Sequence, residues 1–226
     1  MFFRSDEDNA TVVRLLAEQV RRDISFGVLE PDTRLKIDDL RQRYGGSAHS
    51  FREALTLLAA DGLVEASAQR GFRVASATQA DLEDILRLRA EIEPLGLRWS
   101  MDRGDVRWEG EVVASRHALL RTSEAVVADP EGFALDWDDA RRIFHASLVS
   151  ACGSPRLIGV QARLFGQSRR FGLAALREGR IDFARDAATA EALVEAVLAK
   201  LVREAAELLR TYILEPVTGL GHGAGT

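Results

Sequence analysis

The sequence predicts a mostly α-helical protein with two domains, a small helical domain that ends in a β-hairpin and a larger all-α helical bundle. The length of 226 residues is comfortable for two domains. Apolar residues recur every three or four positions along most of the chain, and this pattern changes to strand-like alternation only over residues 62–76. No stretch approaches the roughly eighteen consecutive apolar residues that a membrane span needs, so we expect no membrane partner.

The first predicted element is an amphipathic helix. The members of its apolar stripe lie three or four residues apart: Val13, Leu16, Val20 and Ile24. Gly27 ends this helix. Residues 1–9 are acidic and lack the basic flank and apolar stretch of a signal peptide, so we expect them to form a flexible leader.

The next two predicted elements form a helix–turn–helix pair. A short helix covers residues 37–44, and Gly45-Gly46 breaks it. Ser47 is suited to cap the following helix, because its hydroxyl can accept a hydrogen bond from a free backbone amide of the first turn. That helix covers residues 48–60, with apolar side chains on one face. The opposite face carries polar side chains: His49, Arg52 and Thr56.

The alternating segment 62–76 surrounds a glycine-bearing turn and predicts a β-hairpin. Three helices followed by a hairpin are typical of a winged helix-turn-helix domain, which we assign to residues 10–77. In such a domain the second helix of the pair enters the major groove of DNA. We therefore expect DNA contacts from the start of this helix and from the hairpin tip: Ser47, His49, Arg52, Thr56, Gln69 and Arg70.

The chain after Thr78 is predicted to be helical almost throughout. We expect helices at 79–101, 108–128, 133–152, 155–178 and 183–213, separated by short polar breaks that contain glycine. Their apolar stripes suit a helical bundle, which we assign to residues 78–215. The remaining residues, 216–226, are expected to form a disordered tail.

Composition and motifs exclude several classes of protein. The net charge of −5 gives no indication of a nucleic-acid partner, although residues 10–77 carry slightly more basic than acidic side chains. Cys152 is the only cysteine, so there is no disulfide framework or cysteine zinc cluster, and we expect a cytoplasmic protein. We find no nucleophile with a base, no phosphate loop and no paired catalytic carboxylates, so we expect no enzyme.

The N-terminal residues resemble the GntR superfamily of bacterial transcription regulators. The resemblance spans about residues 10–77 and rests on Phe51-Arg52-Glu53-Ala54-Leu55, Gly62-Leu63-Val64 and Arg70-Gly71-Phe72-Arg73-Val74. Three positions depart from the family's pattern, because an arginine, a threonine and a proline are replaced by Ala48, His49 and Ser50. Losing one arginine–guanine contact would relax or change the operator without abolishing contact with the DNA backbone.

The C-terminal residues resemble the FCD effector domain of the FadR-type branch of that superfamily. The segments that carry the resemblance are DLEDILRLRAEIEP, with Arg89 and Glu93 at their usual places, IFHASLVSACGSPRL and RLFGQSRRF. The resemblance implies a homodimer whose helical domain binds a small organic acid, commonly beside a divalent metal. It implies that the metal ligands are an Asp or His four residues before the histidine of the Phe-His pair, that histidine, and two further histidines on the last long helix.

The metal ligands of the family are mostly missing from this sequence. Of the ligands that the resemblance implies, only His145 is retained. Arg141 stands four residues before it, and the other two positions hold Ala190 and Tyr212. A guanidinium cannot ligate a metal, and one imidazole does not hold a zinc ion, so we expect no metal cofactor.

Two interpretations of the effector cavity stay open. In the first, Arg141 takes the place of the metal's charge and binds the carboxylate of an organic or sugar acid. The residues expected to contribute are Arg89, Arg141, His145, Arg169, Arg170 and Tyr212. In the second, the cavity has decayed, Arg141 pairs with an acid such as Asp138, and His145 is a buried core residue.

These observations predict a homodimeric transcriptional regulator that binds double-stranded DNA. We expect a repressor whose operator affinity is controlled by a small organic-acid effector. One alternative is a degenerate member of the family that acts through protein contacts with little or no effector response, which Ala48 and the acidic leader motivate. A second alternative is a metal-dependent effector sensor.

Overall fold

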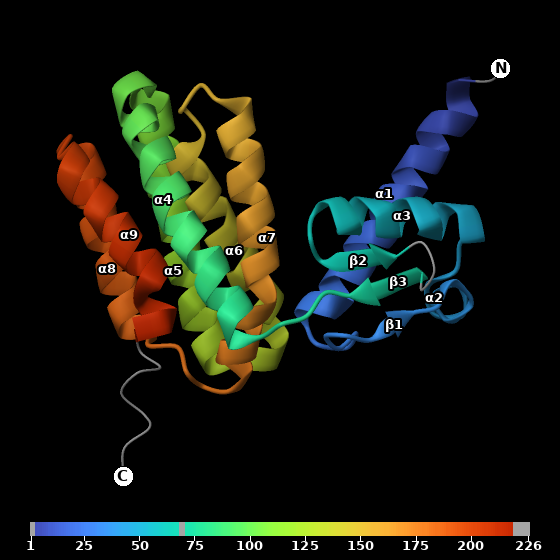
Figure 1. Cartoon of the computed structure of the whole chain (residues 1–226). Helices are drawn as coiled ribbons and strands as arrows, with labels where there is room; N and C mark the ends of the chain where they lie inside the picture. The colour runs from blue at the N-terminus through green and yellow to red at the C-terminus, as the bar shows by residue number, and fades with distance from the viewer. Residues whose placement is uncertain (1–2, 68–70, 219–226) are drawn as a thin grey trace, which may run out of the picture. The chain divides into compact units, whose positions relative to one another are not determined.

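The computed structural model describes residues 3–67 and 71–218, and the side chains of residues 10–67 and 71–215. These residues form nine helices and three strands in two compact units (Figure 1). The first unit consists of Met1–Asp81 with Arg169–Ala174, and the second consists of Leu82–Ser168 with Ala175–Thr226. The division after Asp81 lies within a few residues of the boundary between 77 and 78 that the sequence suggests.

The first unit contains three helices and a small antiparallel sheet. Its elements are α1 (Phe3–Ser25), β1 (Arg34–Leu35), α2 (Ile37–Tyr44), α3 (Ala48–Ala60), β2 (Val64–Ser67) and β3 (Gly71–Val74). Helices α2 and α3 begin and end at the predicted residues. Helix α1 begins at Phe3, so residues 3–9 belong to this helix and not to a separate leader. No glycine or proline interrupts the chain between Phe3 and Ser25, which explains the longer helix.

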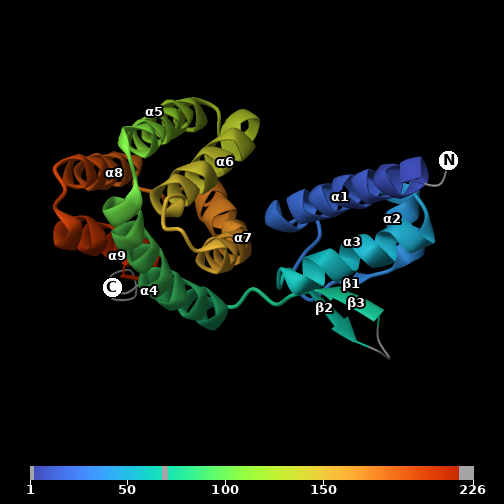
Figure 2. The same cartoon turned by 90° about the horizontal axis from the view of Figure 1, so that it is seen from above.

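The core of the first unit lies between α1, α3 and the sheet. Val20 of α1 and Phe51, Leu55 and Leu58 of α3 are completely buried, and Figure 2 shows α1 and α3 side by side. Strand β3 is central in the order β1-β3-β2 and pairs antiparallel with both neighbours. The two-residue strand β1 was not predicted, because an alternating pattern cannot be recognised in two positions.

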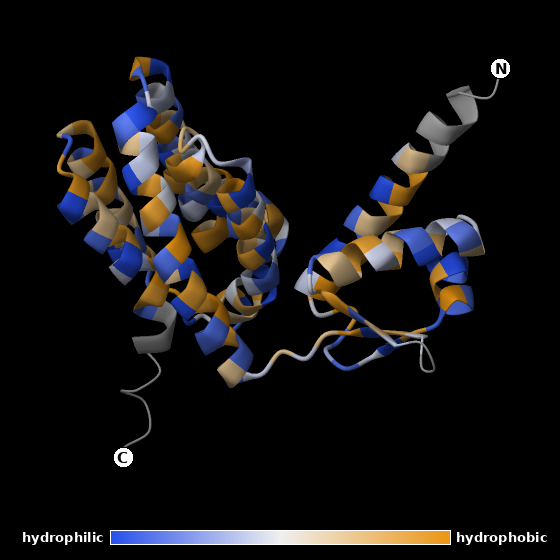
Figure 3. Cartoon of the chain, turned by 45° about the horizontal axis from the view of Figure 1, so that its top comes forward, coloured by the Kyte–Doolittle hydropathy of each residue, from blue (hydrophilic) through white to orange (hydrophobic). Residues whose placement is uncertain are grey.

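Six helices make up the described part of the bundle. They are α4 (Gln79–Arg103), α5 (Val106–Ala128), α6 (Pro130–Val149), α7 (Pro155–Arg177), α8 (Phe183–Leu198) and α9 (Val202–Thr218). Helix α5 packs against α6 and α8, and α8 packs against α9. Figure 3 shows stripes of hydrophobic and hydrophilic residues along these helices, which is the pattern that a bundle with a shared core requires.

The prediction of one helix over residues 183–213 is wrong. The structure divides this segment into α8 and α9, and Lys200 adopts a left-handed conformation at the break, with φ 59°. The amides of Lys200 and Leu201 donate to the carbonyls of Val197 and Ala196, which is the Schellman arrangement that closes a helix. Glycine is the usual residue at this position, and its absence hid the break from the sequence pattern.

Helix α9 continues through Thr218, so residues 216–218 of the predicted tail are helical, and residues 219–226 lie outside the described residues. None of the helices in the described part of the chain is both long enough and apolar enough to span a lipid bilayer.

Candidate DNA-binding face and effector pocket

The turn before α3 fixes the start of this helix. Gly45 and Gly46 both have positive φ angles, 76° and 86°, in the left-handed region that favours glycine. A Cβ atom on Gly46 would lie 3.1 Å from Cδ1 of Leu16, so the turn also needs a small residue to approach α1. Both glycines therefore set the direction in which α3 leaves the turn.

Ser47 is the N-cap of α3, as predicted. Its φ and ψ angles are −93° and 158°, and its Oγ accepts a hydrogen bond of 3.0 Å from the amide of Ser50. The hydroxyl of Ser50 lies 2.8 Å from the hydroxyl of Ser47, and Ser50 is buried. The serine in place of the family's proline therefore belongs to the cap and does not face solvent.

The predicted contact face of α3 is exposed within its unit. His49, Arg52 and Thr56 all lie on the solvent side, opposite the buried Phe51 and Leu55. The Nε2 atom of His49 lies 3.3 Å from Oε1 of Glu53, and the Thr56 hydroxyl donates to the carbonyl of Arg52 at 2.7 Å. The guanidinium of Arg52 therefore extends from the middle of a polar helical face.

Two side chains at the end of α2 hold this helix against α1. The Tyr44 hydroxyl donates to Oδ2 of Asp23 at 2.5 Å, and Nη2 of Arg43 lies 2.9 Å from the same oxygen. Burial and the neighbouring Asp23 carboxylate raise the pKa of Tyr44, so the phenol keeps its proton and remains a donor. Gln69 and Arg70, the predicted contacts at the hairpin tip, lie outside the described residues.

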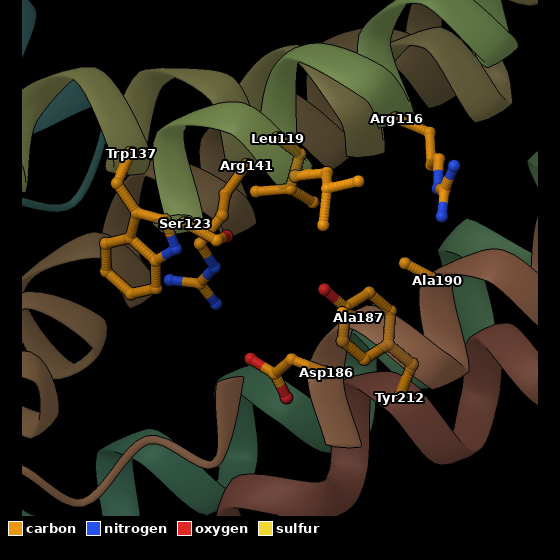
Figure 4. A pocket seen from close by; sticks show the side chains of 10 residues that line it. Arg116, Leu119, Ser123, Trp137, Arg141, Asp186, Ala187, Ala190 and Tyr212 are labelled. Carbon is orange, nitrogen blue, oxygen red and sulfur yellow. The ribbon is translucent and has the colours of Figure 1, made fainter. Parts of the chain in front are cut away.

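The second unit contains a pocket between α5, α6, α8 and α9. It encloses about 330 Å³ of space that no atom fills, part of which is open to solvent. Ten residues line it: Arg116, Leu119, Leu120, Ser123, Trp137, Arg141, Asp186, Ala187, Ala190 and Tyr212. Figure 4 shows the polar ends of Arg141, Asp186 and Tyr212 directed toward the same space.

Arg141 and Tyr212 are the predicted effector residues that line this pocket. The guanidinium carbon of Arg141 lies 4.7 Å from the ring centroid of Trp137, in the position of a cation–π contact. Burial and the carboxylate of Asp186 raise the pKa of Tyr212, so this phenol stays protonated and can donate a hydrogen bond. Asp138, the suggested partner of Arg141, is completely buried.

Arg89 and His145 form a buried cluster with Glu93 and Ser168 instead of lining the pocket. Arg89 donates to Oε1 of Glu93 at 2.6 Å and to the Ser168 hydroxyl at 2.9 Å. Nδ1 of His145 lies 2.7 Å from Oε2 of Glu93. The ring of His145 stacks on Tyr212 with centroids 5.6 Å apart, so the cluster lies directly behind one wall of the pocket.

The protonation states within this cluster follow from burial and charge. Burial alone would raise the pKa of Glu93, but the charge of Arg89 and the contact with His145 lower it to about 2. Burial and the positive charges of Arg89 and Arg141 lower the pKa of His145, although Glu93 opposes them. The imidazole is therefore neutral at pH 7 and donates its Nδ1 proton to an ionised Glu93.

Arg169 and Arg170 do not belong to the pocket. Both lie on α7, in the segment Arg169–Ala174 that groups with the first unit. Arg170 is buried and Arg169 is half-buried. Of the six predicted effector residues, the structure thus brings two to the pocket, Arg141 and Tyr212, and places two more, Arg89 and His145, in the cluster behind it.

Sequence reasoning missed several residues of the pocket, above all Trp137 and Asp186. Each lies one helical turn before a position already singled out, since Trp137 precedes Arg141 by four residues and Asp186 precedes Ala190 by four. Residues four apart share one face of a helix, so this spacing was a usable signal. No such signal pointed to the other two polar residues of the pocket, Arg116 and Ser123. Arg116 forms an ion pair with Glu191.

The residues at this pocket do not fit a divalent metal. Three of the four positions where the family would place ligands hold Arg141, Ala190 and Tyr212, and all three line the pocket. The guanidinium repels a cation, and an alanine offers no ligand atom. Among the residues that the structure describes, no group of three His, Cys, Asp or Glu is placed to hold a metal ion.

The two units match two known family models in the expected order. Residues 13–74 match the model of bacterial regulatory proteins of the gntR family, and residues 84–215 match the model of the FCD domain. Together the two matches leave residues 1–12, 75–83 and 216–226 uncovered.

Two relatives are similar to this chain over most of its length. The uncharacterized HTH-type transcriptional regulator BphR of Paraburkholderia xenovorans (strain LB400) is 35% identical over 204 residues, which are 90% of this chain and 82% of that protein. The HTH-type transcriptional repressor GlaR of Escherichia coli (strain K12) is 34% identical over 201 residues, which are 88% of this chain and 90% of that protein.

Solved structures share the fold at lower sequence identity. McbR/YncC of E. coli has a TM-score of 0.76 and 19% identity, covering 95% of this chain and 99% of that chain. A putative transcriptional regulator GntR from Rhodococcus sp. RHA1 has a TM-score of 0.72 and 22% identity, covering 94% and 99%. At this identity the similarity shows the fold alone.

Proposed function

This chain belongs to the GntR family of bacterial transcriptional regulators, with an FCD domain behind its DNA-binding domain, and we propose that it is a repressor whose hold on DNA is controlled by a small organic acid. The observation that carries the proposal is the exposed polar face of α3, which presents His49, Arg52 and Thr56 in one row behind a capped N-terminus. A helix of this kind fits the major groove.

Arg52 is the residue on which sequence recognition depends in this proposal. With Ala48 in the place of the family's arginine, Arg52 is the remaining side chain of α3 that can hydrogen-bond a guanine in two places. His49 stands beside it on the same face and supplies a further donor. We infer that two such helices, one from each subunit of a homodimer, contact two half-sites of an operator.

The proposed DNA contact is tested by titrating the DNA upstream of the protein's own gene with wild-type protein and with Arg52→Ala. The variant should bind this DNA about ten- to a hundredfold more weakly, because it loses one bidentate contact. Arg121→Ala, an exposed arginine on α5, is the matched control and should bind like the wild type. Equal affinity of Arg52→Ala and the wild type would contradict the assignment of α3 as the contact helix.

The proposed effector is a carboxylic acid that Arg141 holds without a metal. Arg141 is half-buried and stacked on Trp137, and burial strengthens the pairing of a guanidinium with a carboxylate. The hydroxyls of Tyr212 and Ser123 line the same space and supply neutral hydrogen-bonding groups. These features favour a bound anion over the interpretation of a decayed cavity.

Thermal shifts across a panel of organic and sugar acids test this part of the proposal, with and without a chelator. A binding acid should raise the melting temperature of the wild type equally in both conditions, since ligand binding stabilises the folded state. Arg141→Met should lose the shift, while Arg142→Met, an exposed neighbour on α6, should keep it. A shift that disappears with the chelator would contradict the metal-free site.

A further inference from the structure

We propose that the effector is zwitterionic, with a carboxylate that meets Arg141 and an ammonium group that meets Asp186. This inference rests on the proposed function, because it takes the contact of Arg141 with a carboxylate as given. It adds the chemistry of the other end of the ligand, and it assigns Asp186 as the residue that selects for a positive charge.

The pocket is lined by a positively charged side chain on one side and a negatively charged side chain on the other. Arg141 enters it from α6 and Asp186 from the first turn of α8, and Figure 4 shows the two side chains directed toward one another across the space. In the part of the chain that the structure describes, neither side chain takes part in an ion pair. By contrast, the second arginine of the pocket, Arg116, is already paired with Glu191.

The surroundings of Asp186 leave its negative charge poorly compensated. The groups that face it are Arg141 on α6, Asp182 and Arg185 on α8, and Tyr212 and Glu215 on α9. Arg185 already forms an ion pair with Glu215, with 2.5 Å between Nε and Oε1. Burial, Glu215 and Asp182 together outweigh the two arginines and raise the pKa of Asp186 to about 6. An ammonium group from a ligand would supply the missing positive charge.

The same charges disfavour the other simple acids. A dicarboxylate that bound Arg141 would bring its second carboxylate toward Asp186, and the two negative charges would repel unless one of them took up a proton. A monocarboxylate would leave Asp186 half-buried without a counter-ion. A ligand with one carboxylate and one ammonium group offers an opposite charge to both Arg141 and Asp186, and it keeps Asp186 ionised.

Calorimetric titration of the full-length protein tests this proposal with three matched series at pH 7.5. The ligands are ω-amino acids with one to five methylene groups, and the monocarboxylates and dicarboxylates of the same lengths. At the best length, the amino acid should bind about tenfold or more tightly than either plain acid. Dicarboxylate binding should strengthen as the pH falls from 7.5 to 5.5, because Asp186 then becomes protonated.

Two variants separate this proposal from the one on which it rests. Asp186→Asn should lose the preference for the amino acid and still bind plain acids, whereas Asp136→Asn, an exposed aspartate on α6, should keep the wild-type preference. Arg141→Met should weaken the binding of all three series. A wild type that prefers a plain acid at pH 7.5, or an Asp186→Asn variant with unchanged preference, would overturn the zwitterion alone. Failure of every series to bind would overturn the acid effector as well.

Discussion

At the scale of single residues, the effector domain combines a satisfied buried cluster with an unsatisfied pocket. Within the buried cluster, Arg89 and His145 both hydrogen-bond the ionised carboxylate of Glu93, so the charges of Arg89 and Glu93 offset each other. A buried ion pair of this kind holds a defined arrangement, and removing one partner typically costs about 3–5 kcal/mol. Arg141 and Asp186 take part in no ion pair in the described part of the chain, and this contrast is the reason that we propose a ligand contact for both.

Asp186→Asn should make the protein more stable without ligand, with a gain that grows as the pH rises from about 3.8 to about 6 and stays constant above that. The folded protein holds the proton of Asp186 more tightly than the unfolded chain, because the pKa rises from 3.8 to about 6 on folding. The stabilisation that this proton provides is fully present below pH 3.8 and is lost as the pH rises through 6. Asparagine cannot ionise, so the variant avoids that loss.

The size of this effect is modest because Asp186 is half-exposed. After allowance for solvent screening we expect about 1 kcal/mol in the free energy of unfolding at pH 7.5, and about half of that at pH 5. Denaturant unfolding at both pH values measures it, with Asp136→Asn as the control. A variant that is equally stable or less stable than the wild type at pH 7.5 would show that Asp186 carries no uncompensated charge.

At the scale of elements, helix termini decided which predictions succeeded. The end of α2 and the start of α3 were predicted as observed because Gly45-Gly46 and Ser47 mark them by residue type. The boundary between α8 and α9 escaped prediction because a lysine occupies the left-handed position at which glycine is expected. Local chemistry therefore predicts an element well where its ends carry the usual residues, and poorly where tertiary structure imposes the conformation.

Lys200→Gly should stabilise the protein relative to Lys200→Ala by about 1 kcal/mol. Both variants remove the ion pair of Lys200 with Glu109 and the contact with Trp108, so their difference isolates the backbone. Glycine adopts a φ of 59° without the steric cost that a Cβ atom imposes there. Thermal unfolding of the two variants in parallel checks this. An alanine variant as stable as the glycine variant would mean that the break carries no conformational strain.

At the scale of the whole molecule, the order of domains and the mostly helical fold were predicted and are confirmed. The helical periodicity and the change to alternation in the hairpin were sufficient for this, and the family matches cover the same two regions. The pocket was predicted less completely. It forms where α5, α6, α8 and α9 meet, and which side chains converge there depends on helix rotation and packing that one sequence does not display.

The titration of the upstream DNA, repeated at increasing salt concentrations, tests the central claim most directly. If the first unit binds DNA through α3 and its basic side chains, the affinity of the wild type should fall steeply between about 50 and 200 mM salt, because each phosphate contact releases bound cations. Arg52→Ala should lie below the wild type throughout. An affinity that stays constant over this range, or binding that never exceeds that of unrelated DNA, would contradict the claim that this protein is a DNA-binding regulator.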